Sequence, residues 1–333
     1  MTETLGPQYG HGNRAFLQAL MAHGAMSFKD GRPILAAILT ADNKGDPIVR
    51  PEQVQEEDFR AYIDAASQAA SLFDYEIRTT EHQVKKRRIW ALVNTASDPQ
   101  TQLATTYNAE ELAFINRTLE AMFDTYNRPR LEVLAITEMQ AIKLARPKRR
   151  QSTQVNEGED ATQSTADRGL KHSEVEMVLA SLVDGGWFEK SREGFYSLTP
   201  RGLLELRPWL IETFNDPDME PNEWQRIKFC EACKDLVTVG LRCSEPDCTF
   251  RIHGICEEAF WRTRRDKKCP KCSRDWVGDR FVGEKAVTST DAYIRGRDRR
   301  GGRRSTLADE VIQEHAGEDE DDEEEDEVDT TEV

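Results

Sequence analysis

The chain has 333 residues, of which 38% are hydrophobic and 32% are charged, and its formal net charge is -16 at pH 7. This length suits two or three globular domains, and no apolar run approaches the roughly 20 residues that a membrane-spanning helix needs. The N-terminal residues also lack the apolar segment of a secretory signal, so we expect a soluble, intracellular protein with no membrane partner.

The negative charge is concentrated at the C-terminal end of the chain. Residues 317–333 contain 12 acidic and no basic side chains, which leaves a net charge of -4 for residues 1–316. An acidic total therefore does not exclude a local basic surface that contacts nucleic acid, because local charges set the field there.

Residues 9–100 are predicted to form helices followed by a β-hairpin. Apolar side chains recur at helical spacing in the first part, and the pattern then changes to that of paired strands around a polar turn. Helices are predicted at residues 13–23, 33–39 and 57–71, and strands at 74–79 and 88–93. Three helices and a two-stranded hairpin predict a winged-helix domain.

The same order of elements recurs in residues 105–216. Asn108 is a predicted N-cap, Thr137 and Ser173 each begin a capping box, and a proline follows Thr199 at the start of another helix. A hairpin lies between the last two of these helices. The pattern predicts a second winged-helix domain, which a polar insertion at residues 147–167 interrupts; we expect the insertion to be disordered.

All seven cysteines lie within residues 230–272, and their spacing is typical of metal ligands. Two cysteine pairs have a two-residue gap that a tight turn can present to one ion, and His253 and Cys256 have the same gap. Eight ligands form two tetrahedral sites that leave no position for a catalytic water, so we expect two structural zinc ions. This clustering also indicates a reducing compartment.

A cross-brace arrangement, in which alternate ligand pairs share an ion, assigns these eight residues to two sites. The first site is predicted to contain Cys230, Cys233, His253 and Cys256. The second is predicted to contain Cys243, Cys248, Cys269 and Cys272. The predicted module spans residues 225–280 and is too small to fold around an apolar core without metal.

The ligand order fits both PHD fingers, which bind histone tails, and variant RING domains, which recruit ubiquitin-conjugating enzymes. Pro270, in the last cysteine pair, and Trp261, on a predicted helix, favour the RING interpretation, whereas Glu231 stands where RING domains often have an aliphatic residue. A RING domain needs no nucleophile of its own because it orients a charged conjugating enzyme. The candidate contacts with that enzyme are Ala232, Leu236, Trp261 and Pro270.

The order of two winged helices and a variant RING resembles one family, the RING-bearing non-SMC element subunit of the structural-maintenance-of-chromosomes five/six complex. The resemblance covers roughly residues 10–280, from the sequence Asn-Arg-Ala-Phe-Leu-Gln at residue 13 to Cys272. It implies an α+β fold of tandem winged helices followed by a cross-brace two-zinc domain, in a nuclear, chromosome-associated protein. It also implies a MAGE-type winged-helix partner, a kleisin-like partner, and ubiquitin-ligase activity in recombinational DNA repair.

Three functions are therefore compatible with the sequence. The leading hypothesis is a ubiquitin-ligase subunit, the second is a non-enzymatic assembly or DNA-binding scaffold, and the third is a PHD-like histone reader. Basic residues at 85–88, on the predicted wing, and at 148–150 are candidate DNA contacts. Residues 281–333, arginine-rich and then acidic, are predicted to be disordered.

Overall fold

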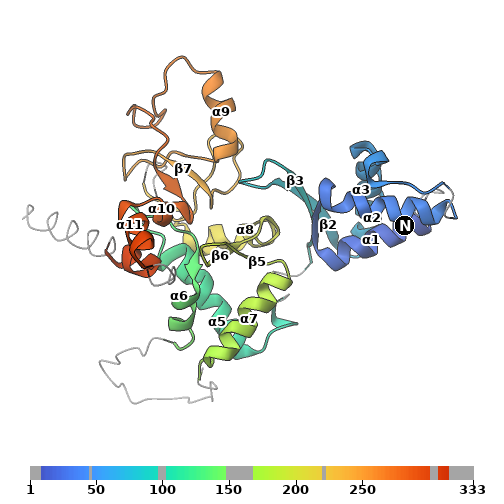
Figure 1. Ribbon diagram of the computed structural model, residues 1–333, viewed down its shortest axis with the longest axis horizontal. Helices are drawn as coiled ribbons and strands as arrows, with labels where there is room; N and C mark the ends of the chain where they lie inside the picture. The colour runs from blue at the N-terminus through green and yellow to red at the C-terminus, as the bar shows by residue number, and fades with distance from the viewer. Residues whose placement is uncertain are drawn as a thin grey trace, which may run out of the picture.

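The computed structural model describes residues 9–44, 47–96, 103–147, 168–219, 223–300 and 307–314 (Figure 1). The predicted insertion at 147–167 and the acidic residues 317–333 lie almost entirely outside this part of the chain. None of the helices in the described part is both long and apolar enough to cross a membrane.

The N-terminal unit, residues 9–96, contains three helices and a three-stranded antiparallel sheet in the order β1-β3-β2. Its elements are α1 (His11–His23), β1 (Ala25–Ser27), α2 (Phe28–Asp42), the 3-10 turn η1 (Pro51–Gln53), α3 (Glu56–Ser71), β2 (Tyr75–Glu81) and β3 (Arg88–Asn94). Phe59 is fully buried at its centre, where its ring contacts Phe16, Phe28 and Trp90 edge-on. This unit has a hydrophobic core of its own.

The second unit, residues 103–219, repeats this plan with a sheet in the order β4-β6-β5. Its elements are α5 (Ala109–Glu120), which continues into the π-helical turn η2 (Ala121–Thr125), then β4 (Ile136–Thr137), α6 (Glu138–Lys143), α7 (His172–Asp184), β5 (Phe188–Lys190), β6 (Phe195–Leu198) and α8 (Pro200–Phe214). Asn108, Thr137 and Thr199 cap their helices as the sequence predicts. Ser173 does not begin its helix: α7 starts one residue earlier, and Glu174 accepts the Lys171 amide instead.

The zinc module, residues 223–282, has a small sheet in the order β8-β7-β9 beside one helix. Its elements are β7 (Gly240–Arg242), β8 (Arg251–Ile252), α9 (Gly254–Arg262) and β9 (Phe281–Val282). Its buried side chains belong to the same continuous hydrophobic cluster as those of the second unit. The second unit and the zinc module therefore share one core, unlike the N-terminal unit.

The prediction that residues 281–333 are disordered is wrong for the part of this segment that the structure describes. Residues 281–282 form β9, and α10 (Lys285–Thr288), α11 (Asp291–Arg300) and a helical segment at 307–314 follow. Figure 1 shows α10 and α11 against the second unit. Apolar side chains in these helices, such as Tyr293 and Val311, pack against Leu131, Val133 and Phe195. Burial of these few residues offsets the cost of ordering a highly charged segment.

Candidate metal centre

Cys230, Cys233, His253 and Cys256 form the first of two metal-ligand clusters. The two earlier cysteines lie on a turn, His253 precedes α9, and Cys256 lies in its first turn. Each residue offers a ligand atom, and these atoms all lie within 4.8 Å of one another. The Cys233 sulfur is 3.3 Å from Nδ1 of His253, whose Nε2–H donates to the Leu236 carbonyl at 2.9 Å. This bond fixes the ring with Nδ1 facing the thiols, as a metal-binding histidine requires.

Cys243, Cys248, Cys269 and Cys272 form the second cluster within the same limit. The sulfurs of Cys243 and Cys272 are 3.4 Å apart, and those of Cys248 and Cys269 are 3.5 Å apart. Four sulfurs around a tetrahedral zinc ion, with bonds of about 2.3 Å, lie about 3.8 Å from one another. The cluster therefore has the donor set and size of a structural zinc site, and the chain has two such sites.

The two Cys-x-x-Cys turns have the same backbone conformation. The amide of Lys234 donates to the Cys230 carbonyl at 2.8 Å, and the amide of Ser273 donates to the Cys269 carbonyl at 2.9 Å. Lys234 and Ser273 both have positive φ, 64° and 61°. This repeated turn explains why a two-residue gap presents both sulfurs to one side, and why the local sequence was sufficient to identify these ligands.

Electrostatics in the first cluster also favour a metal ion. Burial raises the pKa of Cys230, but hydrogen bonds from His253 and from backbone amides outweigh it and lower the pKa to about 6. Burial and the neighbouring thiolates raise the pKa of Cys256 well above its ordinary value. Four ligands this close cannot all be deprotonated without a cation among them, and a zinc ion supplies that charge.

The four candidate contacts with a conjugating enzyme differ in exposure. Ala232 and Pro270 are exposed on the two cysteine turns. Leu236 and Trp261 are buried, with 5% and 6% of their surface exposed. Trp261 packs among Phe250, Phe260 and Trp276. Leu236 and Trp261 therefore contribute to the interior of the module, and only Ala232 and Pro270 offer side chains to a partner.

Glu231 connects the two cysteine turns. Its carboxylate is 2.7 Å from Nζ of Lys234 and 2.9 Å from Nζ of Lys271. Ala232 follows Glu231, and Pro270 precedes Lys271, so this ion pair holds the two exposed residues on one face. A charged residue after the first ligand thus has a structural role in this chain.

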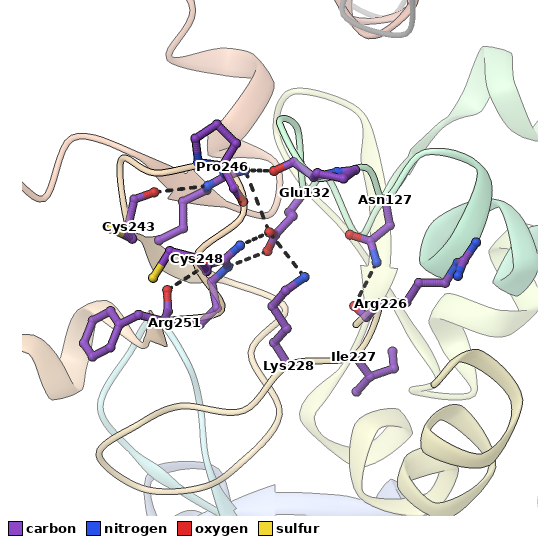
Figure 2. Close-up of polar contacts among 12 residues, drawn as sticks. Asn127, Glu132, Arg226, Ile227, Lys228, Cys243, Pro246, Cys248 and Arg251 are labelled. Atoms are coloured by element: carbon purple, nitrogen blue, oxygen red, sulfur yellow. Dashed lines mark hydrogen bonds and ion pairs between the residues drawn. The ribbon is translucent and has the colours of Figure 1, made fainter. Parts of the chain in front are cut away.

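A buried ion cluster joins the second unit to the zinc module (Figure 2). Glu132, in the loop before β4, accepts hydrogen bonds from Nε of Arg251 at 2.8 Å and from the second terminal nitrogen of the same guanidinium. Nζ of Lys228 lies 3.4 Å from the same carboxylate, and Nη1 of Arg242 lies 3.8 Å from it. Burial alone raises the pKa of Glu132, but these cations lower it to about 2. Burial lowers the pKa of Lys228 to about 7.

The β2-β3 hairpin of the N-terminal unit extends to the zinc module (Figure 1). Gln83, in the turn between β2 and β3, donates to the Leu236 carbonyl at 3.1 Å. Its side-chain oxygen accepts from the amides of Thr238 and Val239 at 3.0 and 2.8 Å. Sequence reasoning missed both Gln83 and Glu132, because nothing in a single loop residue indicates a partner about 100 or more positions away.

The candidate DNA contacts are only partly described. Lys85 lies beside a cavity between the hairpin and β5, and Arg87 lies 3.9 Å from Asp30. Residues 148–150 lie outside the described part of the chain. The predicted wing therefore contacts other parts of the same chain.

Comparisons with known proteins agree with this geometry. Residues 13–206 match the family described as the Nse1 non-SMC component of the SMC5-6 complex, and residues 230–272 match a RING-like domain. The human non-structural maintenance of chromosomes element 1 homolog is 23% identical over 264 residues, 79% of this chain and 83% of that protein. Element 1 of Saccharomyces cerevisiae is 24% identical over 243 residues, 66% of this chain and 68% of that protein.

A solved structure has a similar fold. A chain of an Nse1-Nse3-Nse4 complex superposes with a TM-score of 0.59 at 21% identity, covering 83% of this chain and 99% of that chain. The mixed helix-and-sheet architecture with a C-terminal RING-like zinc cluster is thus confirmed, while the winged-helix assignment of the two units stays a prediction.

Proposed function

The chain belongs to the family of Nse1 non-SMC components of the SMC5-6 complex, and from that membership we propose that it is a ubiquitin-ligase subunit. In this proposal the zinc module recruits a ubiquitin-conjugating enzyme and the protein acts in recombinational DNA repair. The RING-like match at residues 230–272 is the observation that carries the proposal. The two closed four-ligand clusters support it, because RING domains use zinc for structure and leave the chemistry to the conjugating enzyme.

The proposed docking face consists of the two cysteine turns. Ala232 and Pro270 are exposed there, and the bonds from Glu231 to Lys271 hold the turns side by side. A small, preorganised apolar face loses little entropy when a partner binds. Leu236 and Trp261 support this face from the interior of the module.

The proposed partners follow from the similar solved structure, a chain of an Nse1-Nse3-Nse4 complex. We assign this chain a MAGE-type winged-helix partner and a kleisin partner by analogy, and a nuclear, chromosome-associated location. The helices and hairpins of the N-terminal and second units are the surfaces proposed for the MAGE-type partner.

Ubiquitin-chain formation by the reconstituted complex tests the proposal. The full chain is purified with a MAGE-type and a kleisin subunit and assayed with a panel of conjugating enzymes. Ala232→Glu and Pro270→Glu are expected to lower activity at least about 10-fold by placing a charge in an apolar contact. Ile48→Glu, at an exposed position in the loop between α2 and η1, is the matched control. All variants should retain two zinc ions per chain.

A specific observation favours the second function, a non-enzymatic scaffold. The zinc module shares a core with the second unit and is bonded to the N-terminal unit through Gln83, so it also fixes the arrangement of the three units. If the zinc-loaded complex is inactive with every conjugating enzyme while the subunits still assemble, the scaffold function is correct.

A further inference from the structure

Both zinc clusters are connected to residues that lie outside the zinc module. The second cluster is connected through Glu132 of the second unit. Arg251, which Glu132 binds, donates to the carbonyl of the ligand residue Cys248 at 2.6 Å and to that of Phe250 at 2.7 Å. Figure 2 shows this path from Glu132 through Arg251 to Cys248. One buried carboxylate thus orients a buried arginine that holds the backbone of a metal ligand.

A second arginine makes the corresponding contact at the other end of the same ligand loop. Arg242 lies 3.8 Å from Glu132 and donates to the carbonyls of Cys243 at 3.3 Å and Pro246 at 3.3 Å. Cys243 and Cys248 are the first two ligands of the second cluster. Glu132 therefore pairs with both arginines that hold the backbone of these two ligands, with Arg251 by hydrogen bonds and with Arg242 by charge.

The charges of the buried ion cluster also support a link between Glu132 and the second zinc site. Glu132 is one carboxylate against the side chains of Arg242, Arg251 and Lys228, so the buried cluster has an excess of positive charge. A zinc ion with four thiolates is net negative, because the thiolates outnumber the charges of the ion. The buried arginines and the loaded second site are thus complementary. Glu132 holds Arg251 directly by hydrogen bonds, whereas Arg242 also donates to the Pro129 carbonyl.

The first cluster has its own external contact, Gln83 of the N-terminal hairpin. Its amide donates to the Leu236 carbonyl, which also accepts Nε2–H of the ligand His253. Its oxygen binds the amides of Thr238 and Val239 in the same loop. Gln83 thus fixes the position of the carbonyl that orients the histidine ring.

We propose that each zinc site is held by one positioning residue from a preceding unit: Gln83 for the cluster that contains His253, and Glu132 for the cluster of four cysteines. Partners behind a ligand fix its orientation and typically change metal affinity 10- to 100-fold. By linkage, zinc in each site then stabilises the attachment of the zinc module to one neighbouring unit. The proposal rests on the ligand assignment and is independent of ligase activity.

Cobalt(II) substitution distinguishes the two sites in the full chain. Cobalt bound by four thiolates and cobalt bound by three thiolates and an imidazole have different absorption spectra, so the loss of each to a chelator can be followed separately. Glu132→Gln keeps the shape of the side chain and removes its charge. It is expected to speed metal loss from the four-cysteine site about 10-fold or more, with the other site changed less than about 3-fold. Gln83→Ala is expected to do the reverse.

Matched controls are Glu258→Gln, the same change at an exposed position of α9, and Gln68→Ala on α3, both expected to leave the two rates unchanged. If Glu132→Gln does not fold, Glu132→Asp keeps the charge with a shorter reach and should give a smaller effect on the same site. The proposal would be overturned if either variant speeds metal loss equally at both sites, or if neither variant speeds metal loss at any site.

Discussion

Glu132 and Arg251 form a two-point ion pair in which both side chains are buried, with 2% and 0% of their surfaces exposed. Removing Arg251 breaks the buried pair and takes a buried donor away from Glu132 and from the Cys248 carbonyl, which costs about 3–5 kcal/mol. Arg251→Met should therefore lower the free energy of unfolding of the block formed by the second unit and the zinc module by this amount. Urea denaturation followed by tryptophan fluorescence measures it. Arg262→Met, which breaks an exposed pair on α9, should change the same quantity by less than about 0.5 kcal/mol.

The same carboxylate predicts how stability depends on pH. The pKa of Glu132 is about 2 in the folded chain and 4.5 ordinarily, so its depressed pKa stabilises the fold at pH values above 4.5. This contribution is lost as pH falls from 4.5 towards 2. The contribution of Glu132 to the stability difference between the wild type and Glu132→Gln should thus shrink as the pH falls below about 4.5. Because Glu132→Gln is also expected to weaken one zinc site, the zinc content is measured at each pH and only samples that hold two zinc ions per chain are compared. A difference that persists unchanged at the lowest such pH below 4.5 contradicts the prediction.

The sequence was sufficient for features that depend on neighbouring residues. The Cys-x-x-Cys turns are local, and their spacing alone assigned the eight residues that the structure gathers into two clusters. The long helices and the two hairpins are likewise periodic over enough residues to be recognised. Strands β1 and β4, with three and two residues, are too short to show a period, although each completes a sheet.

Features that depend on partners far away in the chain could not be predicted from the sequence. Glu132 is a charged loop residue, and such residues are usually exposed, so only the fold reveals its arginine partners. Tyr293 and Val311 lie in a segment whose average charge predicts disorder, and several of their packing partners, such as Phe195, lie more than 90 residues earlier in the chain. Composition averages over a segment and therefore conceals a few well-placed apolar side chains.

Metal removal should affect the units unequally. The zinc module and second unit share a core, whereas the N-terminal unit has its own. Chelation, or Cys269→Ala, should therefore increase hydrogen exchange in both the zinc module and the second unit, while α1 to α3 keep their protection. If the zinc module folded independently, the second unit would keep its protection as well. Unchanged protection of α8 after complete zinc removal would therefore contradict the prediction.

Packing in the N-terminal unit makes Gly31 a sensitive position. A Cβ at Gly31 would lie 2.2 Å from Cε2 of the Phe59 ring, which is itself held by Phe16 and Trp90. Gly31→Ala should thus destabilise this unit by about 1–3 kcal/mol despite the better helix propensity of alanine. Thermal unfolding measures the change. Gly10→Ala, where the nearest atom is 4.0 Å away, is the steric control; Gly10 is the N-cap of α1, so this change should cost only the weaker capping by alanine, less than about 1 kcal/mol.

The C-terminal helices should stabilise the second unit through Tyr293. Its side chain is fully buried, and its hydroxyl donates to Glu193 at 3.1 Å. Tyr293→Ala removes a buried aromatic ring and should cost about 3–5 kcal/mol, whereas Tyr293→Phe loses only the hydrogen bond, about 1 kcal/mol. Ile294, its neighbour, is 38% exposed, so Ile294→Ala should cost less than about 1 kcal/mol.

Truncation tests the same packing without a point substitution. A chain that ends at residue 284 keeps β9 and loses Tyr293 and also Asp309, which accepts from Thr137 at 3.0 Å and pairs with Lys143 at 2.7 Å. It should therefore unfold at a lower urea concentration than the full chain. A chain that ends at residue 316 retains these contacts and lacks only the last 17 residues, 12 of which are acidic, so its midpoint should match that of the full chain. Equal stability of all three chains would mean that the helices after residue 282 contribute nothing to the fold.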